Sequence, residues 1–384
     1  MNTFPAVLIG GPPHSGKSVL TYLLTQCLRQ RGIEHYVLRA CPDGEGDWSQ
    51  ESTPDQVRLL RQKGAFDRTF VDRVCRDIEQ RHLPLLVDAG GRPTLDQERI
   101  IQRCTHAIVL SANSQGMNEW RNRVEQYGLI IVAELHSELH GSDQIEVEKP
   151  VLRGVISGLE RNVLTGGMVV EALVNRLARL MHYEKAELVQ QHLQRASAEL
   201  VVDLDQLARQ MWAEATQRRW VPPDLRQILD SIPAKTPLAI YGRGPNWLYA
   251  ALAGHTAPAP FSLFDPRLGW AQAQSLRCVP QPVADVIRWQ TREERDYTLL
   301  KAHLLEPYLD YDDLSDLTVP RLDPQRGVVV SGKLPFWLLT SLIVTYHEHP
   351  WLAVIQPQLN PNSVIIFSRC EDYRPGNSIQ VVLD

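Results

Sequence analysis

The pattern of apolar and polar positions divides the chain near residue 182. Before this point, short apolar runs alternate with stretches in which apolar residues recur at helical spacing. Such alternation is typical of a parallel β-sheet covered by helices, and it predicts an α/β domain over residues 1–182. The expected elements are a strand at 6–9, a helix ending near 31, strands at 35–39, 82–88, 107–110, 129–133 and 152–158, and a closing helix over 162–181.

The second half contains one pattern twice. Tyr241-Gly-Arg-Gly-Pro-Asn-Trp-Leu248 returns as Ser331-Gly-Lys-Leu-Pro-Phe-Trp-Leu338, with glycine, proline, tryptophan and leucine paired at one offset, 332 − 242 = 90. A register of this length predicts a duplicated domain. We place the first copy at 183–291, including a polar helical connector at 183–198, and the second copy at 292–384.

Each copy is expected to be a small α+β unit with one main helix. The first opens with a strand at 199–202 and carries a helical insertion at 205–217 before its repeated core. The second opens with a strand at 297–304, has its core over 327–359 and finishes with strands at 364–368 and 378–383. Trp247 and Trp337 lie on the apolar faces of the two main helices, so we expect both in the core.

A basic residue stands at the same place in both copies, between the strand and the helix. Arg243 is flanked by Gly242 and Gly244, and Lys333 follows Gly332. The free N–H groups and the positive dipole end of a helix start attract anions, and a neighbouring cation adds to this attraction. Two such units about a pseudo-two-fold axis would suit a ligand whose phosphates repeat by symmetry.

The apolar run 6–9 leads directly into Gly11-Pro-Pro-His-Ser-Gly-Lys-Ser18, which fits the P-loop pattern in its strand–loop–helix context. In this pattern backbone N–H groups cradle phosphates, the lysine reaches the β and γ oxygens, and the final hydroxyl ligates Mg²⁺. His14 is expected to fill space rather than to catalyse. The sequence therefore predicts that ATP and Mg²⁺ are bound by Gly11, Pro12, Pro13, His14, Ser15, Gly16, Lys17 and Ser18.

Charged residues after other predicted strands are further candidates. Asp88 ends the strand 82–88 and is expected to hold the magnesium shell together with Ser18. Asp43 or Asp47, in an acidic loop, would accept the proton of an attacking hydroxyl, unless this loop is only solvated. Possible phosphate contacts, most of them expected at the surface, are Arg92, Arg121, Arg123, Arg153 and Arg161.

The composition narrows the class of protein. The 384 residues are 43% hydrophobic and 22% charged, as in an ordinary globular protein. The net charge of −5 argues against a general surface for duplex DNA. No apolar run has the length of a membrane span, and the first residues lack a signal sequence. The six cysteines form no C-x-x-C pair, which indicates reduced thiols and predicts a cytoplasmic protein.

Two strings point to a family. Gly242-Arg-Gly-Pro-Asn-Trp-Leu248 and Phe264-Asp-Pro-Arg-Leu-Gly269 resemble the CRISPR-associated ring nucleases that cut cyclic tetra-adenylate, the messenger of type III systems. The similarity is greatest to the small ring nuclease found fused to a P-loop, AAA-like or kinase-like domain, and it covers both copies. It implies two tandem ring-nuclease-like domains, cleavage of cyclic tetra-adenylate to linear oligoadenylate in antiviral defence, Mn²⁺ as the metal, and a homo-oligomer.

The resemblance also implies site residues. The family has a histidine shortly before the strand that begins at Pro260 or Pro350, and an aspartate and an arginine in the turn after that strand. The first copy keeps Asp265 and Arg267 but has no histidine at this place. The second copy offers His347 or His349, but its turn reads Gln356-Pro-Gln358.

Because the family takes the histidine and the Asp/Arg pair from different subunits, the copies would complement each other, within one chain or between chains. His347 would act as general acid or base. Arg267 would offset charge developing on the phosphate, and Asp265 would ligate Mn²⁺. The alternative is that both copies only bind the ligand.

Three functions fit these features. The first is a ring nuclease joined to an ATP-using domain that phosphorylates the linear product or RNA ends, or drives assembly. The second is a sensor of cyclic oligoadenylate that gates an NTPase without cleavage. The third is a nucleotide kinase whose repeats serve oligomerisation.

Overall fold

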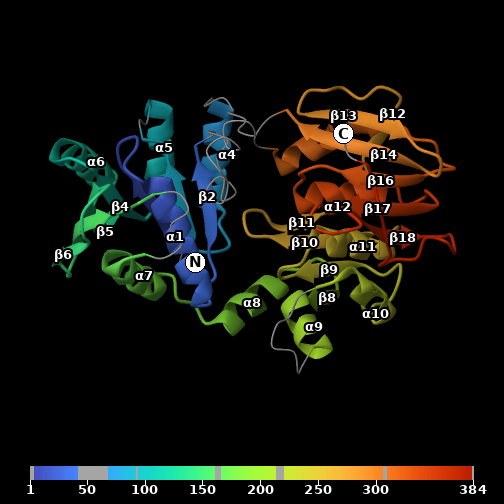
Figure 1. Cartoon of the computed structure of the whole chain (residues 1–384), viewed down its shortest axis with the longest axis horizontal. Coiled ribbons are helices and arrows are strands. Elements are labelled where there is room, and N and C mark those ends of the chain that lie inside the picture. Colours follow the sequence, from blue (N-terminus) through green and yellow to red (C-terminus); the bar gives the residue numbers. More distant parts are fainter. Residues whose placement is uncertain are drawn as a thin grey trace. The chain divides into compact units, whose positions relative to one another are not determined.

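The structure is a computed structural model that describes residues 4–41, 68–91, 94–160, 166–212, 220–305 and 309–382. The chain forms two compact units, residues 1–188 with 266–268 and residues 189–265 with 269–384 (Figure 1). No helix among the described residues has the length and apolar character needed to cross a bilayer. The six cysteines form no disulfide.

The first unit is built on a seven-stranded sheet, which confirms the predicted α/β class. Its strand order is β2-β3-β1-β4-β5-β7-β6, and every neighbouring pair is parallel except the antiparallel pair of β6 and β7. The central strands are apolar and buried because helices cover both faces. The strands are β1 (Ala6–Gly10), β2 (Tyr36–Ala40), β3 (Leu85–Ala89), β4 (His106–Ser111), β5 (Ile130–Glu138), β6 (Gln144–Val147) and β7 (Leu152–Ser157).

Helices α1 and α7 pack together against the same buried strands, and α4 packs against α5. Strand β6 was not predicted, although its residues Gln-Ile-Glu-Val alternate between polar and apolar, because the alternation is only four residues long. Helix α7 begins later than predicted, where the Asp143 carboxylate accepts a hydrogen bond from the backbone N–H of Val169. The helices are α1 (Lys17–Gln30), α4 (Arg68–Glu79), α5 (Leu95–Arg103), α6 (Ser114–Gln126) and α7 (Met168–Leu180).

The first copy of the repeat forms a four-stranded sheet with the order β11-β10-β9-β8. Strands β8, β9 and β10 are parallel, and β11 runs antiparallel to β10. Its elements are α8 (Lys185–Leu193), β8 (Leu200–Asp203), α9 (Leu204–Met211), a 3₁₀ turn (Pro222–Asp224), α10 (Leu225–Asp230), β9 (Leu238–Tyr241), α11 (Asn246–Thr256), β10 (Phe261–Asp265), β11 (Gly269–Gln272) and β12 (Arg277–Val279).

The second copy forms a six-stranded sheet with the order β13-β14-β16-β17-β18-β19. Strands β14, β16 and β17 are parallel, and β18 runs antiparallel to β17. Its elements are β13 (Ile287–Glu293), β14 (Tyr297–Leu304), a 3₁₀ turn (Tyr311–Ser315), β15 (Thr318–Pro320), β16 (Gly327–Ser331), α12 (Phe336–Thr345), β17 (Trp351–Ile355), β18 (Ser363–Ser368) and β19 (Ser378–Ile379).

The duplication appears in the topology as well as in the sequence. Strands β8, β9, β10 and β11 correspond to β14, β16, β17 and β18, with the same pairing directions, and α11 corresponds to α12. Strand β13 crosses the division that we placed at residue 291 and pairs antiparallel with β14. It is an addition to the second sheet that the first sheet lacks.

Helices α11 and α12 pack against each other between the two sheets and run in the same direction. The Tyr249 ring, near the start of α11, lies 4.6 Å from the Phe336 ring at the start of α12. Near the other end, a Cβ added to Gly254 would lie 3.4 Å from Ile343 Cγ2. Both helix starts, and with them the carboxyl ends of the parallel strands of both sheets, therefore lie at one end of this unit.

A buried carboxylate joins three elements of the first unit. Glu134 in β5 is 5% exposed and forms ion pairs with Arg121 of α6 and Arg153 of β7. Burial alone raises the pKa of the Glu134 carboxyl, but the hydrogen bonds and charges of the two arginines outweigh it and hold the pKa below its ordinary range. Both arginines were possible phosphate contacts, and the structure assigns them to Glu134 instead.

We predict that Glu134→Gln lowers the free energy of unfolding by about 1–3 kcal/mol at pH 7, because charge-assisted hydrogen bonds of a buried group are lost. The wild-type contribution is fully present above the unfolded-state pKa of about 4.3, and it is lost as pH falls through the lower folded-state pKa. Denaturant unfolding between pH 7 and pH 3 tests this. Exposed Glu125→Gln on the same helix as Arg121 is the control, and equal behaviour of the two variants would contradict the prediction.

Candidate functional site

The loop between β1 and α1 is enclosed on several sides by backbone and side chains. Gly16 has a left-handed φ of 87°, and a Cβ there would lie 2.8 Å from Leu159 Cδ1. A Cβ at Gly91, just after β3, would lie 2.4 Å from the backbone nitrogen of Pro13. Glycine is therefore required at these positions by conformation or by space. The result is a backbone loop that passes directly into a helix start.

Lys17 and Ser15 both turn toward the carbonyl of Pro12 inside this loop. Lys17 Nζ donates to Pro12 O at 2.7 Å, and Ser15 Oγ donates to the same oxygen at 2.9 Å. Lys17 is 8% exposed, and burial lowers the pKa of its ammonium group, while the charges of Asp88 and Cys41 act against this. A buried ammonium held by one carbonyl retains hydrogen-bonding capacity for an anion.

Asp88 lies beside this loop because β3 is the direct neighbour of β1, with Ile9 and Asp88 in register. Its carboxylate forms an ion pair with Arg39, the adjacent residue on β2. Arg39 was missed by the sequence analysis. It ends a predicted strand, but no local signal shows which strand becomes its neighbour.

The remaining candidate residues of the first unit have different environments. Ser18 is the second residue of α1. His14 is exposed and has a left-handed φ of 61°. Arg123 pairs with Glu98 at 3.3 Å. Asp43, Asp47, Arg92 and Arg161 lie outside the described residues.

The two repeated loops of the second unit both end in a proline that precedes the first helical residue. Pro245 and Pro335 have extended ψ angles of 157° and 147°, and α11 and α12 begin one residue later. Gly242 has a left-handed φ of 98°, and its carbonyl accepts a hydrogen bond from the buried Tyr249 hydroxyl. The loop Gly242–Gly244 is thereby fixed against its own helix.

The start of α11 also touches the other copy. Asn246 Nδ2 donates to the carbonyl of Ile355, the last residue of β17, at 3.3 Å. The loops that carry Arg243 and Lys333 therefore lie at the same end of the unit, together with the carboxyl ends of β10 and β17. Asp265 is the last residue of β10, and Arg267 lies in the turn that leads to β11.

His347 lies at the opposite end of this unit. It follows α12, whose 10 residues separate it from Lys333 by roughly 15 Å along the helix axis. Its Nδ1 is 2.7 Å from Val344 O, and its Nε2 is 2.8 Å from a carboxylate oxygen of Glu348. The structure therefore does not bring His347 together with Asp265 inside one chain.

His349 is less suited to chemistry than His347. It is 7% exposed, and its Nδ1 is 2.9 Å from the carbonyl of Arg326. His347 is 20% exposed and lies against Glu348, a carboxylate whose pKa is lowered by Arg369 and, further, by His347. Of the two histidines, His347 is the one that a ligand could reach.

The residues around Asp265 do not make a complete metal site. No group of three or more His, Cys, Asp or Glu side chains within the described ranges could hold a metal ion. A hard divalent ion takes about six oxygen ligands, so a single carboxylate does not fit a resident Mn²⁺.

A histidine outside the repeat supports the first copy at this end. His192 of α8 is 3% exposed, its Nδ1 is 2.9 Å from the Tyr241 hydroxyl, and its ring stacks on Phe264 at 4.3 Å. Tyr241 immediately precedes Gly242, and Phe264 immediately precedes Asp265. One buried ring thus touches both strands that present the candidate residues. The sequence analysis treated α8 only as a polar connector.

The repeats match a known family. A family model described as a CRISPR-associated protein, Cas_csx3, matches residues 213–287 and again residues 302–380. An uncharacterized protein of Aquifex aeolicus is 39% identical over 80 residues, which cover 19% of this chain and 72% of that protein. Residues 213–287 and 302–380 each belong to the CRISPR-associated Cas_csx3 family. The two matched segments confirm the two copies that the repeat predicted, and apart from residues 266–268 both lie in the second unit.

We predict that His192→Ala lowers the free energy of unfolding of the Cas_csx3 unit by about 2–4 kcal/mol, because a buried stacked ring and its hydrogen bond are lost. Tyr241→Phe should cost about 1 kcal/mol, and the double variant should be less destabilised than the sum. Denaturant unfolding of the four proteins of this cycle gives the coupling energy. His140→Ala, at an exposed position, is the control. Strict additivity would show that the two side chains do not support each other.

Proposed function

We propose that this Cas_csx3 protein binds cyclic tetra-adenylate at the end of the second unit that carries Arg243 and Lys333. The observation that carries the proposal is the parallel packing of α11 and α12, which gathers two basic helix starts at one end. Each start offers backbone N–H groups and a cation to a phosphate. A cyclic oligonucleotide has phosphates related by rotation, which would suit two duplicated loops at one end of the unit.

Cleavage would proceed by attack of a ribose 2′-hydroxyl on the phosphorus of the 3′-phosphate of the same ribose. The new O–P bond forms as the bond from phosphorus to the 5′-oxygen breaks, which leaves a 2′,3′-cyclic phosphate and a free 5′-hydroxyl. His347 would take the proton of the 2′-hydroxyl or give one to the 5′-oxygen, since an imidazole changes its charge near neutral pH. Arg267 would offset the charge on the phosphate oxygens. No step is assigned to Mn²⁺.

The opposite placement of His347 and Asp265 favours a site made by two chains. If one chain presents Asp265 and Arg267, a second must present His347 against the same phosphate. Of the two alternatives left by the sequence, a site within one chain or between chains, we therefore propose the site between two chains. The same observation favours a second function, a sensor that binds the ligand without cleavage whenever chains do not stack.

For the first unit we propose ATP binding by the loop Gly11–Ser18. The enclosed loop, the left-handed Gly16 and the Lys17 ammonium fit a triphosphate, and Ser18 and Asp88 would hold its Mg²⁺. The ion would neutralise phosphate charge. Asp88 must then exchange Arg39 for the ion or its water shell. The phosphoryl acceptor would be the linear oligoadenylate or another RNA end, with Asp43 as the base proposed from the sequence.

We expect Lys17→Ala to abolish ATP turnover while the fold is retained, because the variant removes the only cation of the loop sequence. The measurement is phosphate release or transfer from labelled ATP, with circular dichroism as the fold control. Lys185→Ala, on an exposed position of α8, is the matched lysine variant. Turnover by well-folded Lys17→Ala protein at the wild-type rate would exclude the nucleotide site.

Arg243→Ala and Lys333→Ala should each weaken binding of cyclic tetra-adenylate by roughly tenfold or more, because each removes a charge-assisted contact to phosphate. The loss should be larger at low salt, where such contacts are least screened. Calorimetric titration at two salt concentrations measures this, with exposed Arg226→Ala as the control. Wild-type affinity in both variants would exclude this end of the unit as the binding site.

The two-chain site predicts complementation. Arg267→Ala and His347→Ala should each stop cleavage yet still bind the ligand, because the helix starts that would hold the phosphates are unchanged. In an equal mixture, about a quarter of the junctions in a head-to-tail assembly would hold both intact residues, so activity should return to roughly that fraction. Product formation from labelled cyclic tetra-adenylate is the readout. If mixing restores nothing, the site is formed within one chain, and cleavage by His347→Ala alone would exclude this histidine.

A further inference from the structure

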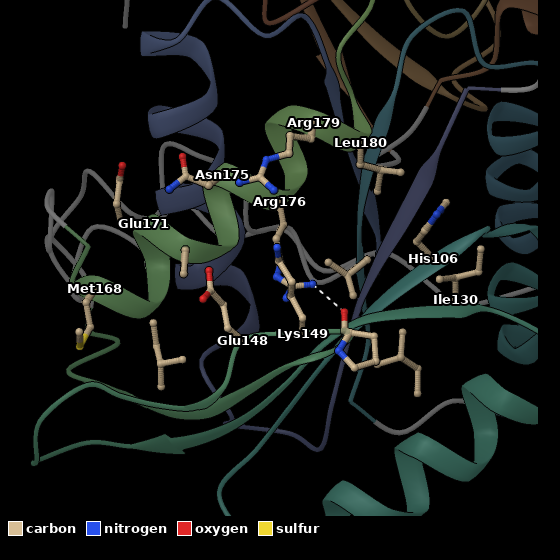
Figure 2. A pocket seen from close by; sticks show the side chains of 15 residues that line it. His106, Ile130, Glu148, Lys149, Met168, Glu171, Asn175, Arg176, Arg179 and Leu180 are labelled. Atoms are coloured by element: carbon tan, nitrogen blue, oxygen red, sulfur yellow. Dashed lines mark hydrogen bonds between the residues drawn. The ribbon is translucent and has the colours of Figure 1, made fainter.

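The first unit contains a hollow of about 710 Å³ that no candidate residue described above enters. It is lined by His106 and Ile130, the first residues of β4 and β5, and by α7 above them (Figure 2). The loop Gly11–Ser18 follows the last residue of β1, and β1 is parallel to β4. The hollow therefore lies at the amino ends of the parallel strands, and the loop lies at their carboxyl ends.

One face of α7 forms a wall of the hollow. Met168, Ala172, Arg176 and Arg179 line it at helical spacing, whereas the core-facing positions between them, such as Val170 and Leu173, are buried. The facing wall includes Ile130, Ile131 and Ile145. A space of this size lined mainly by apolar groups and a few charges is characteristic of small-molecule sites.

The apolar part of this lining is partly open to solvent. Ile130 is 62% exposed and Met168 is 57% exposed. Two large apolar side chains facing one hollow would lose water contact if an apolar ligand filled it, which would stabilise the complex by roughly 25 cal/mol for each Å² covered.

The charged part is predominantly cationic. Arg176 Nη1 donates to Pro150 O at 2.9 Å, a contact that leaves its charge unbalanced (Figure 2). Arg179 and Lys149 also line the hollow, and neither has a hydrogen-bond or ion-pair partner within the described part of the chain. Three cations around one space repel one another unless an anion joins them.

Two carboxylates are present, but they do not balance these cations. Glu171 forms an ion pair with Arg31 of α1, and Glu148 remains as the single opposing carboxylate. His106 adds no charge at neutral pH, because burial lowers the pKa of its ring. The lining therefore keeps a net positive charge beside an apolar surface.

We propose that this hollow binds an amphipathic organic anion, with its apolar body against Ile130 and Met168 and its acidic group between Arg176, Arg179 and Lys149. A carboxylate, a phosphate or a sulfonate would serve equally as the acidic group. All the residues that line this hollow belong to the first unit, and none belongs to the loop Gly11–Ser18.

The test uses the full chain and two fluorescent probes of similar shape, anionic anilinonaphthalene sulfonate and neutral phenylnaphthylamine. The wild type should bind the sulfonate at one site and more tightly than the neutral probe. The double variant Lys149→Gln/Arg179→Gln should lose about fivefold to tenfold in affinity for the sulfonate and little for the neutral probe. Arg29→Gln, an exposed arginine of α1, should bind both probes as the wild type does.

Ala172→Trp should fill the hollow and prevent binding of both probes, while Lys17→Ala should bind them normally. Melting curves establish that each variant is folded, since a loosened core also binds these probes. Equal affinity of the wild type and the double variant for the sulfonate would overturn the proposal. So would undiminished binding by folded Ala172→Trp protein, or weak binding at many sites with no preference for the anion.

Discussion

The parallel contact of α11 with α12 determines the arrangement of the second unit. Each helix is buried nearly all round, and α11 contacts β10 of its own sheet as well as α12, β17 and β18 of the other copy. Gly254 permits the close approach, since a Cβ there would meet Phe367 and Ile343 at 3.3–3.4 Å. Because the helices run in the same direction, every strand-to-helix loop faces one end. His347, which follows α12, lies at the opposite end of the unit.

This arrangement gives the divergence of the two copies a physical meaning. A symmetric pair would present the same groups twice at each end. Here the first copy places Asn246 at its helix start and bonds it to Ile355 of the second, whereas the second copy places Phe336 there and stacks it near Tyr249. The two copies thus use their equivalent positions to hold each other. In the proposed two-chain site, each copy could lack a group that a neighbouring chain supplies.

The sequence predicted what depends on local pattern. Apolar runs located most strands, and the 90-residue offset located both copies. It did not predict β6, whose alternating pattern is only four residues long, or the pairing of the edge strand β13 with β14, which depends on a contact that local pattern does not show. It also missed the pairs Arg39–Asp88 and Arg121–Glu134–Arg153, since these depend on which strands become neighbours. The sequence left open whether His347 and Asp265 meet within one chain, because the direction of α11 relative to α12 is not a local property.

In the first unit, the loop Gly11–Ser18 lies beside charged residues from neighbouring strands. Lys17 begins the helix that follows β1, and Asp88 lies on the neighbouring strand β3. The Lys17 ammonium donates to Pro12 O, and the Asp88 carboxylate forms an ion pair with Arg39. Each charge therefore has an internal partner in place of water, which limits the cost of burying it. A phosphate entering the loop would be a stronger acceptor for Lys17 than a carbonyl, and a cation accompanying it would compete with Arg39 for Asp88. Arg39 would then lose its ion pair with Asp88 and would lie at the same end of the strands as the phosphates. The exchange of partners would thus place a second cation beside the loop.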